Sequence, residues 1–181
     1  MENTMSRYTP ETYWDRRYRD GRSSGSGSEG DEGAYKAQYI STFRVANQVT
    51  SVVDWGVGDG QVLRLINMGT TAKYVGVDVS QHAIDTLKQN FADKASQYSF
   101  RLPEDVFISR DLSMSMDVLF HLPNDDSYYS YLDNLFGYAK RFVIIYSTNY
   151  DEVQTAQHVL RRNFTPDIAV RYPEWELTDT E

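Results

Sequence analysis

The stretch Ser51-Val52-Val53-Asp54-Trp55-Gly56-Val57-Gly58-Asp59-Gly60 decides which fold this sequence predicts. It begins with residues that favour a β-strand. Three glycines follow at alternate positions. They allow a turn with unusual φ angles, and a ligand can lie directly against backbone that carries no Cβ. The next residues, 61–66, are typical of the first turns of a helix. Strand, glycine turn and helix in this order predict the first unit of a nucleotide-binding α/β sheet.

A second strand is predicted over residues 73–77, and it is followed by Asp78, Val79 and Ser80. In a Rossmann-like sheet, an acid at the end of the second strand accepts hydrogen bonds from the ribose of a bound nucleotide. Ser80 is a suitable N-cap for a helix over residues 81–91, whose apolar residues share one face. Asp78 and Val79 are therefore candidate cofactor-binding residues.

The glycine spacing separates two classes of cofactor. Dinucleotide-binding enzymes use G-x-G-x-x-G, whereas here the third glycine comes one residue earlier. The pattern D-x-G-x-G-x-G over 54–60, with V-G-V-D-V-S over 75–80, resembles the class I S-adenosylmethionine (SAM) methyltransferases. This resemblance implies that Gly56, Gly58 and Gly60 lie against the amino-acid part of SAM. It also implies that Asp54 orients the ammonium group and that Asp78 holds the ribose.

The N-terminal segment strengthens this resemblance. Y-W-D-x-R-Y over 13–18, S-G-S-G-S-x-G over 24–30 and A-x-K-A over 34–37 resemble the leader of a small bacterial and phage group of these enzymes. The resemblance implies that the Gly/Ser segment is a lid over bound SAM and that Trp14, Arg17 and Tyr18 cover the site. By composition alone, the same segment is a flexible linker and the helix packs its aromatic side chains on the domain. We therefore divide the chain into a cap and lid, 1–33, and a SAM-binding domain, 34–181, in which Lys36 is a solvated flank.

Two acids compete for the adenine end of the cofactor. A third strand is predicted over 98–102, and the fourth over 115–122 by its resemblance to the group's S-L-D-V-x-x-H-L. In class I methyltransferases, an acid between these strands often receives the adenine amino group, and the next backbone N–H meets the ring. Asp105 and Asp111 both lie there. The group's own pattern favours Asp111 with Leu112 as cofactor-binding residues.

The candidate catalytic residues are His121 and Tyr150, which follow the predicted fourth and fifth strands. His121 is suited to act as a general base or to hold the acceptor, because its unperturbed pKa is about 6.5. Alternatively, it closes a loop through a hydrogen bond. The fifth strand is predicted over 141–146 by its continuous apolar run. The resemblance implies that Asn149 and Tyr150 contact the substrate. Alternatively, these residues cap the loop that follows the strand. A short helix from Pro166 and a last strand over 175–177 complete the prediction.

Composition narrows the class of protein. The chain has 181 residues, which suits one domain, and a formal net charge of −8, which argues against a nucleic-acid partner. It contains no cysteine, which excludes disulfides and thiolate metal sites, and no metal site is expected. No apolar run approaches the roughly 20 residues that span a bilayer, and residues 1–4 lack signal-peptide features. We expect a cytoplasmic protein without a membrane partner.

The sequence therefore predicts a Rossmann-like three-layer α/β/α sandwich with a mostly parallel sheet and a shortened C-terminal hairpin. The motifs and the resemblance together predict SAM-dependent methyl transfer, and the resemblance to the group implies a small-molecule or saccharide-type acceptor. Three alternatives remain open at this point. They are a SAM-binding protein without turnover, a nucleic-acid (RNA) methyltransferase and an NAD-dependent oxidoreductase.

Overall fold

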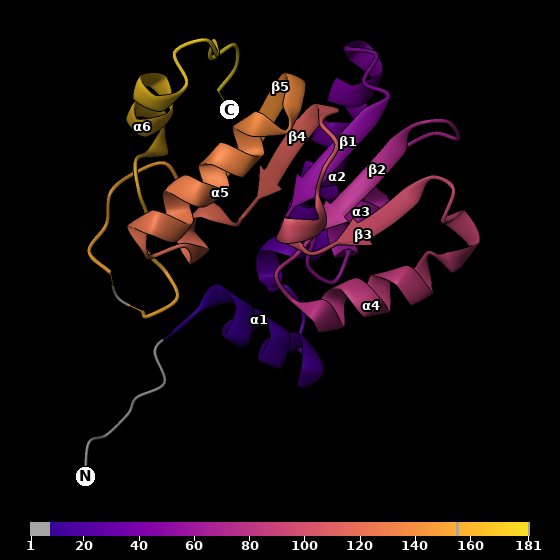
Figure 1. Ribbon diagram of the computed structural model, residues 1–181, viewed down its shortest axis with the longest axis horizontal. Helices are drawn as coiled ribbons and strands as arrows, with labels where there is room; N and C mark the ends of the chain where they lie inside the picture. Colours follow the sequence, from indigo (N-terminus) through magenta and orange to yellow (C-terminus); the bar gives the residue numbers. More distant parts are fainter. Residues whose placement is uncertain (1–7, 155, 181) are drawn as a thin grey trace.

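The structure is a computed structural model, described here for residues 8–154 and 156–180. Five strands form one parallel sheet with the order β3-β2-β1-β4-β5 (Figure 1). In the pairing of β1 with its two neighbours, Trp55 lies opposite Val77 of β2 and Ser115 of β4. The strands are β1 Ser51–Trp55, β2 Lys73–Val77, β3 Tyr98–Arg101, β4 Arg110–Met116 and β5 Ala139–Tyr146.

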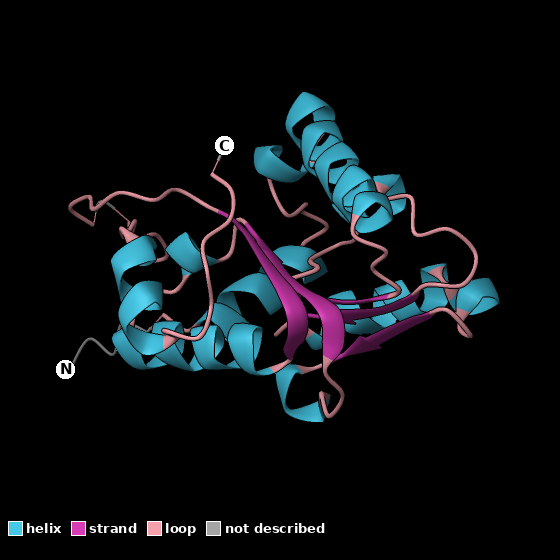
Figure 2. Ribbon diagram, turned by 90° about the horizontal axis from the view of Figure 1, so that it is seen from above, coloured by secondary structure: helices cyan, strands magenta, loops and turns pink. Residues whose placement is uncertain are grey.

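Helices cover both faces of the sheet, as Figure 2 shows from above. Strand residues alternate between two hydrophobic clusters, because successive side chains point to opposite faces. Val52 packs with α2, α3 and α4, whereas Val53 packs with α5. The helices are α1 Pro10–Arg19, α2 Gly30–Ala46, α3 Gln61–Leu65, α4 Gln81–Asn90, α5 Asp125–Gly137 and α6 Phe164–Arg171, with short 3₁₀ turns η1 Ser26–Ser28, η2 Ala92–Lys94, η3 Pro103–Asp105 and η4 Leu119–His121.

The strand order reverses between β1 and β4. In an open α/β sheet, the crevice outside the carboxyl ends of the strands at such a switch point is where ligands bind. The glycine turn follows β1 and η4 follows β4, so both border this crevice. The Rossmann-like α/β prediction is confirmed, with all five strands parallel.

Two predicted strands are wrong. The fourth strand covers Arg110–Met116, not 115–122, and it ends where Asp117 takes a φ of 58°. Since residues 112–116 alternate between apolar side chains and serine, they fit a strand that packs on both faces. The resemblance at 115–122 instead marks the turn after the strand, where Leu119–His121 form η4.

No strand forms at residues 175–177. Trp175 closes a turn onto Tyr172, and both rings pack against Phe136, at centroid distances of 5.5 and 4.2 Å. Among the described residues, β5 is the last strand of the sheet, so the closing hairpin is absent from them. The predicted helix near Pro166 is confirmed as α6. Within the described ranges, no helix has the length and apolar character needed to cross a bilayer.

The two N-terminal helices begin in different ways. Thr9 caps α1, because its side chain accepts a hydrogen bond from the Thr12 N–H. Helix α2 begins at Gly30 without a side-chain cap and carries Asp31 and Glu32 in its first turn, where acids interact favourably with the helix dipole. The predicted division between residues 33 and 34 falls inside this first turn and stays a prediction.

Candidate functional site

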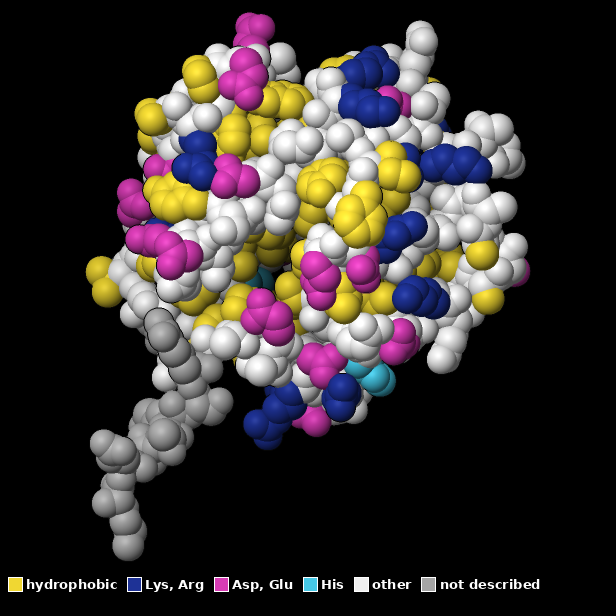
Figure 3. All heavy atoms as spheres, in the orientation of Figure 1, with side chains coloured by type: hydrophobic (Ala, Val, Ile, Leu, Met, Phe, Trp, Pro, Cys, Tyr) yellow, Lys and Arg dark blue, Asp and Glu magenta, His cyan; other side chains and the backbone are white. Residues whose placement is uncertain are grey.

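A cavity of about 370 Å³ lies at the carboxyl ends of β1, β2 and β4. Its floor includes residues 54–57, 77–79 and 116–118, and its cover includes α1 and residues 24–28. Figure 3 shows a hollow between α1 and the sheet in which hydrophobic side chains and a histidine are visible. The volume lies within the range of small-molecule sites, which is roughly 300–1,000 Å³.

The glycine turn is shaped by three left-handed residues. Gly56, Gly58 and Gly60 have φ angles of 85°, 58° and 76°, a region that side-chain-bearing residues rarely adopt. Gly56 lines the cavity, and its N–H donates to the Val77 carbonyl at 2.7 Å. Gly58 faces the cover instead, since a Cβ there would lie closer than 3.0 Å to Ser24. The third glycine, Gly60, packs against Leu87 of α4 and does not line the cavity.

Asp54 provides an unpaired acceptor at the floor of the cavity. Its Oδ2 accepts a hydrogen bond from the Tyr74 hydroxyl, while its buried Oδ1 has no partner. Burial raises the pKa of Asp54 to about 7, partly opposed by the hydrogen bond from Tyr74. A buried polar atom without a partner is costly. Asp54 Oδ1 is therefore suited to receive a donor group from a ligand.

Asp78 holds the glycine turn in place. Its Oδ2 accepts from the Gly58 N–H and its Oδ1 from the Ser80 N–H, both at 2.9 Å. Burial raises the pKa of Asp78 to about 6, although these backbone hydrogen bonds act in the opposite direction. Asp78 and Val79 line the same cavity as Gly56, so the structure brings the two sequence motifs to one site.

The three leader residues also lie at this cavity. Trp14 and Tyr18 stack one helical turn apart, with ring centroids 5.7 Å apart. The Arg17 Nε–H donates to the Ser23 carbonyl at 2.6 Å, and its guanidinium lies 5.7 Å from the Trp14 ring. The tyrosine hydroxyl of Tyr18 lies 3.1 Å from Ser24 Oγ. Helix α1 thus places an aromatic and cationic cover over the glycine turn.

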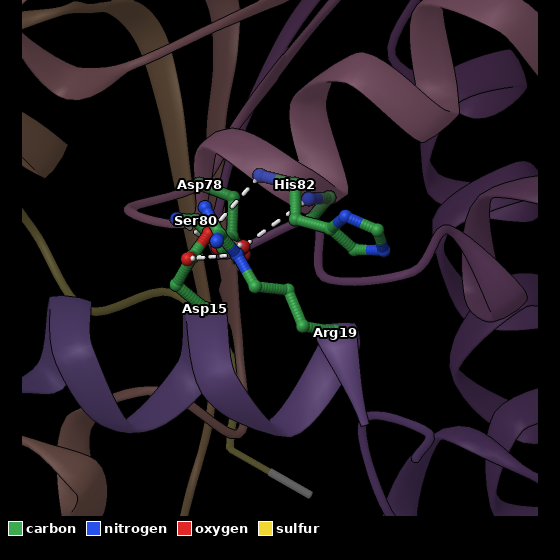
Figure 4. A network of polar contacts seen from close by, with 6 residues as sticks. Asp15, Arg19, Asp78, Ser80 and His82 are labelled. Carbon is green, nitrogen blue, oxygen red and sulfur yellow. Dashed lines mark hydrogen bonds and ion pairs between the residues drawn. The ribbon is translucent and has the colours of Figure 1, made fainter. Parts of the chain in front are cut away.

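Figure 4 shows what holds α1 in position. Asp15 Oδ1 accepts hydrogen bonds from Ser80 Oγ at 2.9 Å and from the His82 N–H at 3.1 Å, at the start of α4. Arg19 forms an ion pair with the other oxygen of Asp15 at 2.7 Å. The pKa of Asp15 is lowered, because these hydrogen bonds and Arg19 outweigh its partial burial. The cap helix is therefore tied to the segment that follows Asp78.

The Gly/Ser segment is fastened to the glycine turn. Ser24 donates from its N–H to Asp59 Oδ2 at 3.1 Å and from its hydroxyl to Asp59 Oδ1 at 2.9 Å. The sequence pattern did not single out Ser24 or Asp59 as partners. Asp59 lies inside the glycine motif, and Ser24 begins the Gly/Ser motif, so only the folded arrangement reveals that the two motifs bind each other.

Lys36 is a buried residue and not the solvated flank that we expected. Its side chain is 1% exposed, its ammonium pairs with Asp117, and it donates to the Gly27 carbonyl at 2.6 Å. The ammonium also lies 4.5 Å from the centre of the Tyr146 ring. Burial raises the pKa of Asp117, because it outweighs the attraction of Lys36. Lys36 thus links the cover to the end of β4.

His121 lines the cavity and its protonation state follows from geometry. Its Nδ1 lies 3.0 Å from the His158 carbonyl, which only accepts, so Nδ1 carries the proton. Burial lowers the pKa of His121 to about 4, so the ring is neutral and Nε2 keeps its lone pair. Among the described residues, this Nε2 has no hydrogen-bond partner. Nδ1 therefore closes the loop, and Nε2 is available for the predicted role of holding an acceptor.

Tyr150 and Asn149 are not brought to the cavity. Tyr150 is 51% exposed, and its ring lies 6.0 Å from the Arg161 guanidinium. The Asn149 side chain accepts from the Phe164 N–H at 2.9 Å and so caps the start of α6. The loop-capping alternative describes Asn149, and Tyr150 does not lie where a catalytic residue of this cavity would be.

Asp111 and Leu112 also lie away from the cavity. Asp111 is near the start of β4, where its Oδ2 accepts from Thr50 and Ser51 at the opposite edge of the sheet from the glycine turn. Leu112 is fully buried within β4. This placement disagrees with the sequence-based choice of Asp111, rather than Asp105, as the residue that contacts the adenine. Asp105 ends η3, whose first residue, Pro103, lines the cavity.

Within the described ranges, no group of three or more histidine or acidic side chains is arranged to hold a metal ion. Four carboxylates line the cavity, and Arg17 is the only lysine or arginine among its described lining residues; the carboxylates are those of Asp54, Asp59, Asp78 and Asp117. The site therefore favours a ligand that carries positive charge over one that carries phosphate.

Comparison with known proteins finds no match among protein-family models and none among curated proteins. Solved structures do match. Magnesium protoporphyrin IX methyltransferase from Synechocystis PCC 6803, solved with bound SAM, is 19% identical, with 78% of this chain and 77% of that chain covered and a TM-score of 0.57. The methyltransferase domain of bacterial CtHen1 is 17% identical, with 78% and 83% covered and a TM-score of 0.60.

The fold is that of the class I methyltransferases. An O-methyltransferase family protein from Burkholderia thailandensis is also similar, at 16% identity, with 77% of this chain and 50% of that chain covered and a TM-score of 0.58. The glycine turn after β1 and the acid after β2 both border the cavity at the switch point of this sheet.

Proposed function

We propose that this chain is a SAM-dependent methyltransferase that acts on a small-molecule acceptor. One observation carries the proposal: the glycine turn after β1 and the acid after β2 border a single cavity, whose floor holds the unpaired Asp54 Oδ1. The likeness of the fold to methyltransferases, one of which has been solved both with bound SAM and with bound SAH, supports the choice of cofactor.

The residues present fit this cofactor. Asp54 would accept the ammonium group, and Asp78 would accept hydrogen bonds from the ribose. Gly56 would lie against the amino-acid part, since it lines the cavity with bare backbone, and a Cβ there would lie closer than 3.0 Å to Val118, which lines the same cavity. Val79 and the η3 turn that ends at Asp105 would border the adenine. Arg17 would pair with the carboxylate, as arginine does at carboxylate sites.

SAM supplies a methyl group on a positively charged sulfur. The chain's own task is to align the acceptor and to exclude water. Trp14 and Tyr18 cover the site with aromatic faces, which also favour a nearby positive charge. His121 offers the Nε2 lone pair, which can accept a hydrogen bond from an acceptor hydroxyl or N–H and orient it.

Charge makes a nucleic-acid substrate the weaker alternative. A protein that grips a phosphate backbone uses lysine and arginine, whereas this cavity is lined by four carboxylates and one arginine. A SAM-binding protein without turnover shares the same cofactor contacts. The narrower relation to the small bacterial and phage group, and a cytoplasmic location, stay predictions.

Isothermal titration with SAM and with S-adenosylhomocysteine (SAH) tests the proposal. We expect saturable binding of both and none of NAD. Asp78→Ala should weaken SAH binding by about 1–3 kcal/mol, since it removes a buried acceptor. The matched control is Asp93→Ala, because Asp93 is an exposed acid in η2 that does not line the cavity. Folded protein that binds neither compound would refute the proposal, and binding without product formation across candidate acceptors would favour the SAM-binding alternative.

A further inference from the structure

One end of the cavity is built mainly from rings. We refer to it as the aromatic end. Its residues come from α1, from η4 and from the segment before α6, and all of them line the cavity: Pro10, Tyr13, Trp14, Phe120, His121 and His158. Resting on the proposed function, we propose that the aromatic end is the acceptor subsite and that it takes a neutral, planar compound with one hydroxyl or N–H donor.

The ring geometry supports a planar ligand. His158 stacks on Tyr13 at 4.7 Å with an interplanar angle of 19°, and Trp14 meets His121 edge-on at 5.0 Å and 80°. The His121 and His158 rings are nearly parallel, 9° apart in orientation, at 5.9 Å. These paired rings hold one another in fixed orientations. A planar ligand can therefore make offset or edge-on contacts with several of them, which aromatic pairs prefer.

The polar atoms at the aromatic end are set singly among ring faces. His121 Nδ1 is committed to the His158 carbonyl, which leaves the Nε2 lone pair for a ligand. The other side-chain polar atoms are the Tyr13 hydroxyl, the Trp14 Nε1–H and the ring nitrogens of His158. A single hydroxyl or N–H on the ligand satisfies His121 Nε2, and a planar ring places the rest of its surface against the ring faces. A saccharide carries several hydroxyls, and each one buried against a ring face without a partner is costly, so the aromatic end suits a planar ring with one donor better than it suits a sugar.

Charge selects against phosphorylated compounds. Asp117 lines the same cavity close to the end of β4, and its ion-pair partner is Lys36, so that lysine is already engaged. Arg17 donates from Nε to the Ser23 carbonyl and lies against the Trp14 ring. A phosphate monoester carries nearly two negative charges at pH 7. In the cavity, a phosphate monoester would lie among carboxylates. Arg17 is the only lysine or arginine among the described lining residues that could pair with it.

Three probes of similar size separate these features. SAH-saturated protein is titrated with 2-naphthol, with decahydro-2-naphthol and with 2-naphthyl phosphate, and binding is followed by calorimetry. We expect 2-naphthol to bind at least about tenfold more tightly than either of the others, which corresponds to one or two ring contacts. Equal or tighter binding of the saturated alcohol or of the phosphate would overturn the proposal. Methyl glucoside, titrated in the same way as a sugar probe, would also overturn it by binding as tightly as 2-naphthol.

A variant of His121 tests whether 2-naphthol binds at the aromatic end. His121→Phe keeps the ring but removes Nε2, and should weaken 2-naphthol binding about three- to tenfold. The control is Tyr150→Phe, which alters an exposed aromatic residue outside the cavity and should leave the affinity unchanged. In side-chain ¹⁵N spectra, 2-naphthol should shift the His121 Nε2 signal, while His82, which does not line the cavity, serves as the internal reference. An unaltered His121 signal would overturn the assignment.

The two proposals fail in different ways. Titration of 2-naphthol in the absence of SAH tests the subsite alone. If 2-naphthol binds and SAH does not, the aromatic subsite is supported and the methyltransferase assignment fails. If SAH binds and 2-naphthol does not, the assignment of the cofactor stands and the inferred acceptor class is refuted.

Discussion

Replacing Lys36 by methionine should destabilise the protein and loosen the cover of the cavity. The change removes a buried ammonium that pairs with Asp117, donates to the Gly27 carbonyl at 2.6 Å and lies 4.5 Å from the Tyr146 ring. Methionine has a similar length and no charge, so it fills the space without replacing these contacts.

The loss in the free energy of unfolding depends mainly on the Asp117 carboxylate, which is left without its ion-pair partner. Breaking a buried ion pair costs about 3–5 kcal/mol when the remaining charge has no access to water. The Asp117 side chain is 25% exposed and water can reach it, which reduces this cost. The lost hydrogen bond to Gly27 adds to it. We expect the free energy of unfolding to fall by about 2–4 kcal/mol. A domain of this size loses about 2–4 °C in Tm per kcal/mol, so Tm should fall by about 4–16 °C.

Urea denaturation measures the loss, with Lys88→Met as the control because Lys88 is an exposed helical lysine. Control values should stay within about 0.5 kcal/mol of the parent. Asp117→Asn should cost at least as much as Lys36→Met, since the lysine that it leaves unpaired is only 1% exposed. The double variant should lose less than the sum of the two. SAH should also dissociate faster from Lys36→Met. A loss below about 0.5 kcal/mol would show that this ion pair does not hold the cover.

The remaining predictions concern the cavity and its surroundings. SAH affinity should rise about tenfold from pH 6 to pH 8, because burial raises the pKa of Asp54 to about 7 and only its ionised form pairs with an ammonium group. Asp54→Asn should abolish this pH dependence. Calorimetric titration at both pH values measures the two affinities. Gly58→Ala should weaken SAH binding and lower Tm, since its φ is 58° and the new Cβ would collide with Ser24. Asp111→Ala should lower Tm through its lost bonds to Thr50 and Ser51 while SAH affinity stays unchanged; a tenfold loss of affinity would mean that Asp111 does reach the cofactor.

The fold class and part of the candidate site could be predicted from local patterns of residues. The glycine turn at 56–60 and the acid at 78 are local patterns, because each follows directly from a strand and a turn. Parallel strands bring their carboxyl ends to the same edge, so the meeting of these two motifs could be predicted without coordinates. The leader residues Trp14 and Tyr18 share one face of a helix for an equally local reason.

Features that depend on strand register or on contacts between residues far apart in the chain could not be predicted in this way. Asp111 and Asp117 lie at opposite ends of β4, roughly 20 Å apart along a strand that rises about 3.3 Å per residue. The prediction placed this strand about five residues too late, and so it treated Asp111 as part of the segment before the strand, whereas Asp111 lies within β4 near its start. The burial of Lys36 depends on Asp117, which is 81 positions away in the chain. The tautomer of His121 depends on a carbonyl 37 positions away. No local pattern of residues carries such information, because the partners meet only when the sheet and its covering helices have assembled.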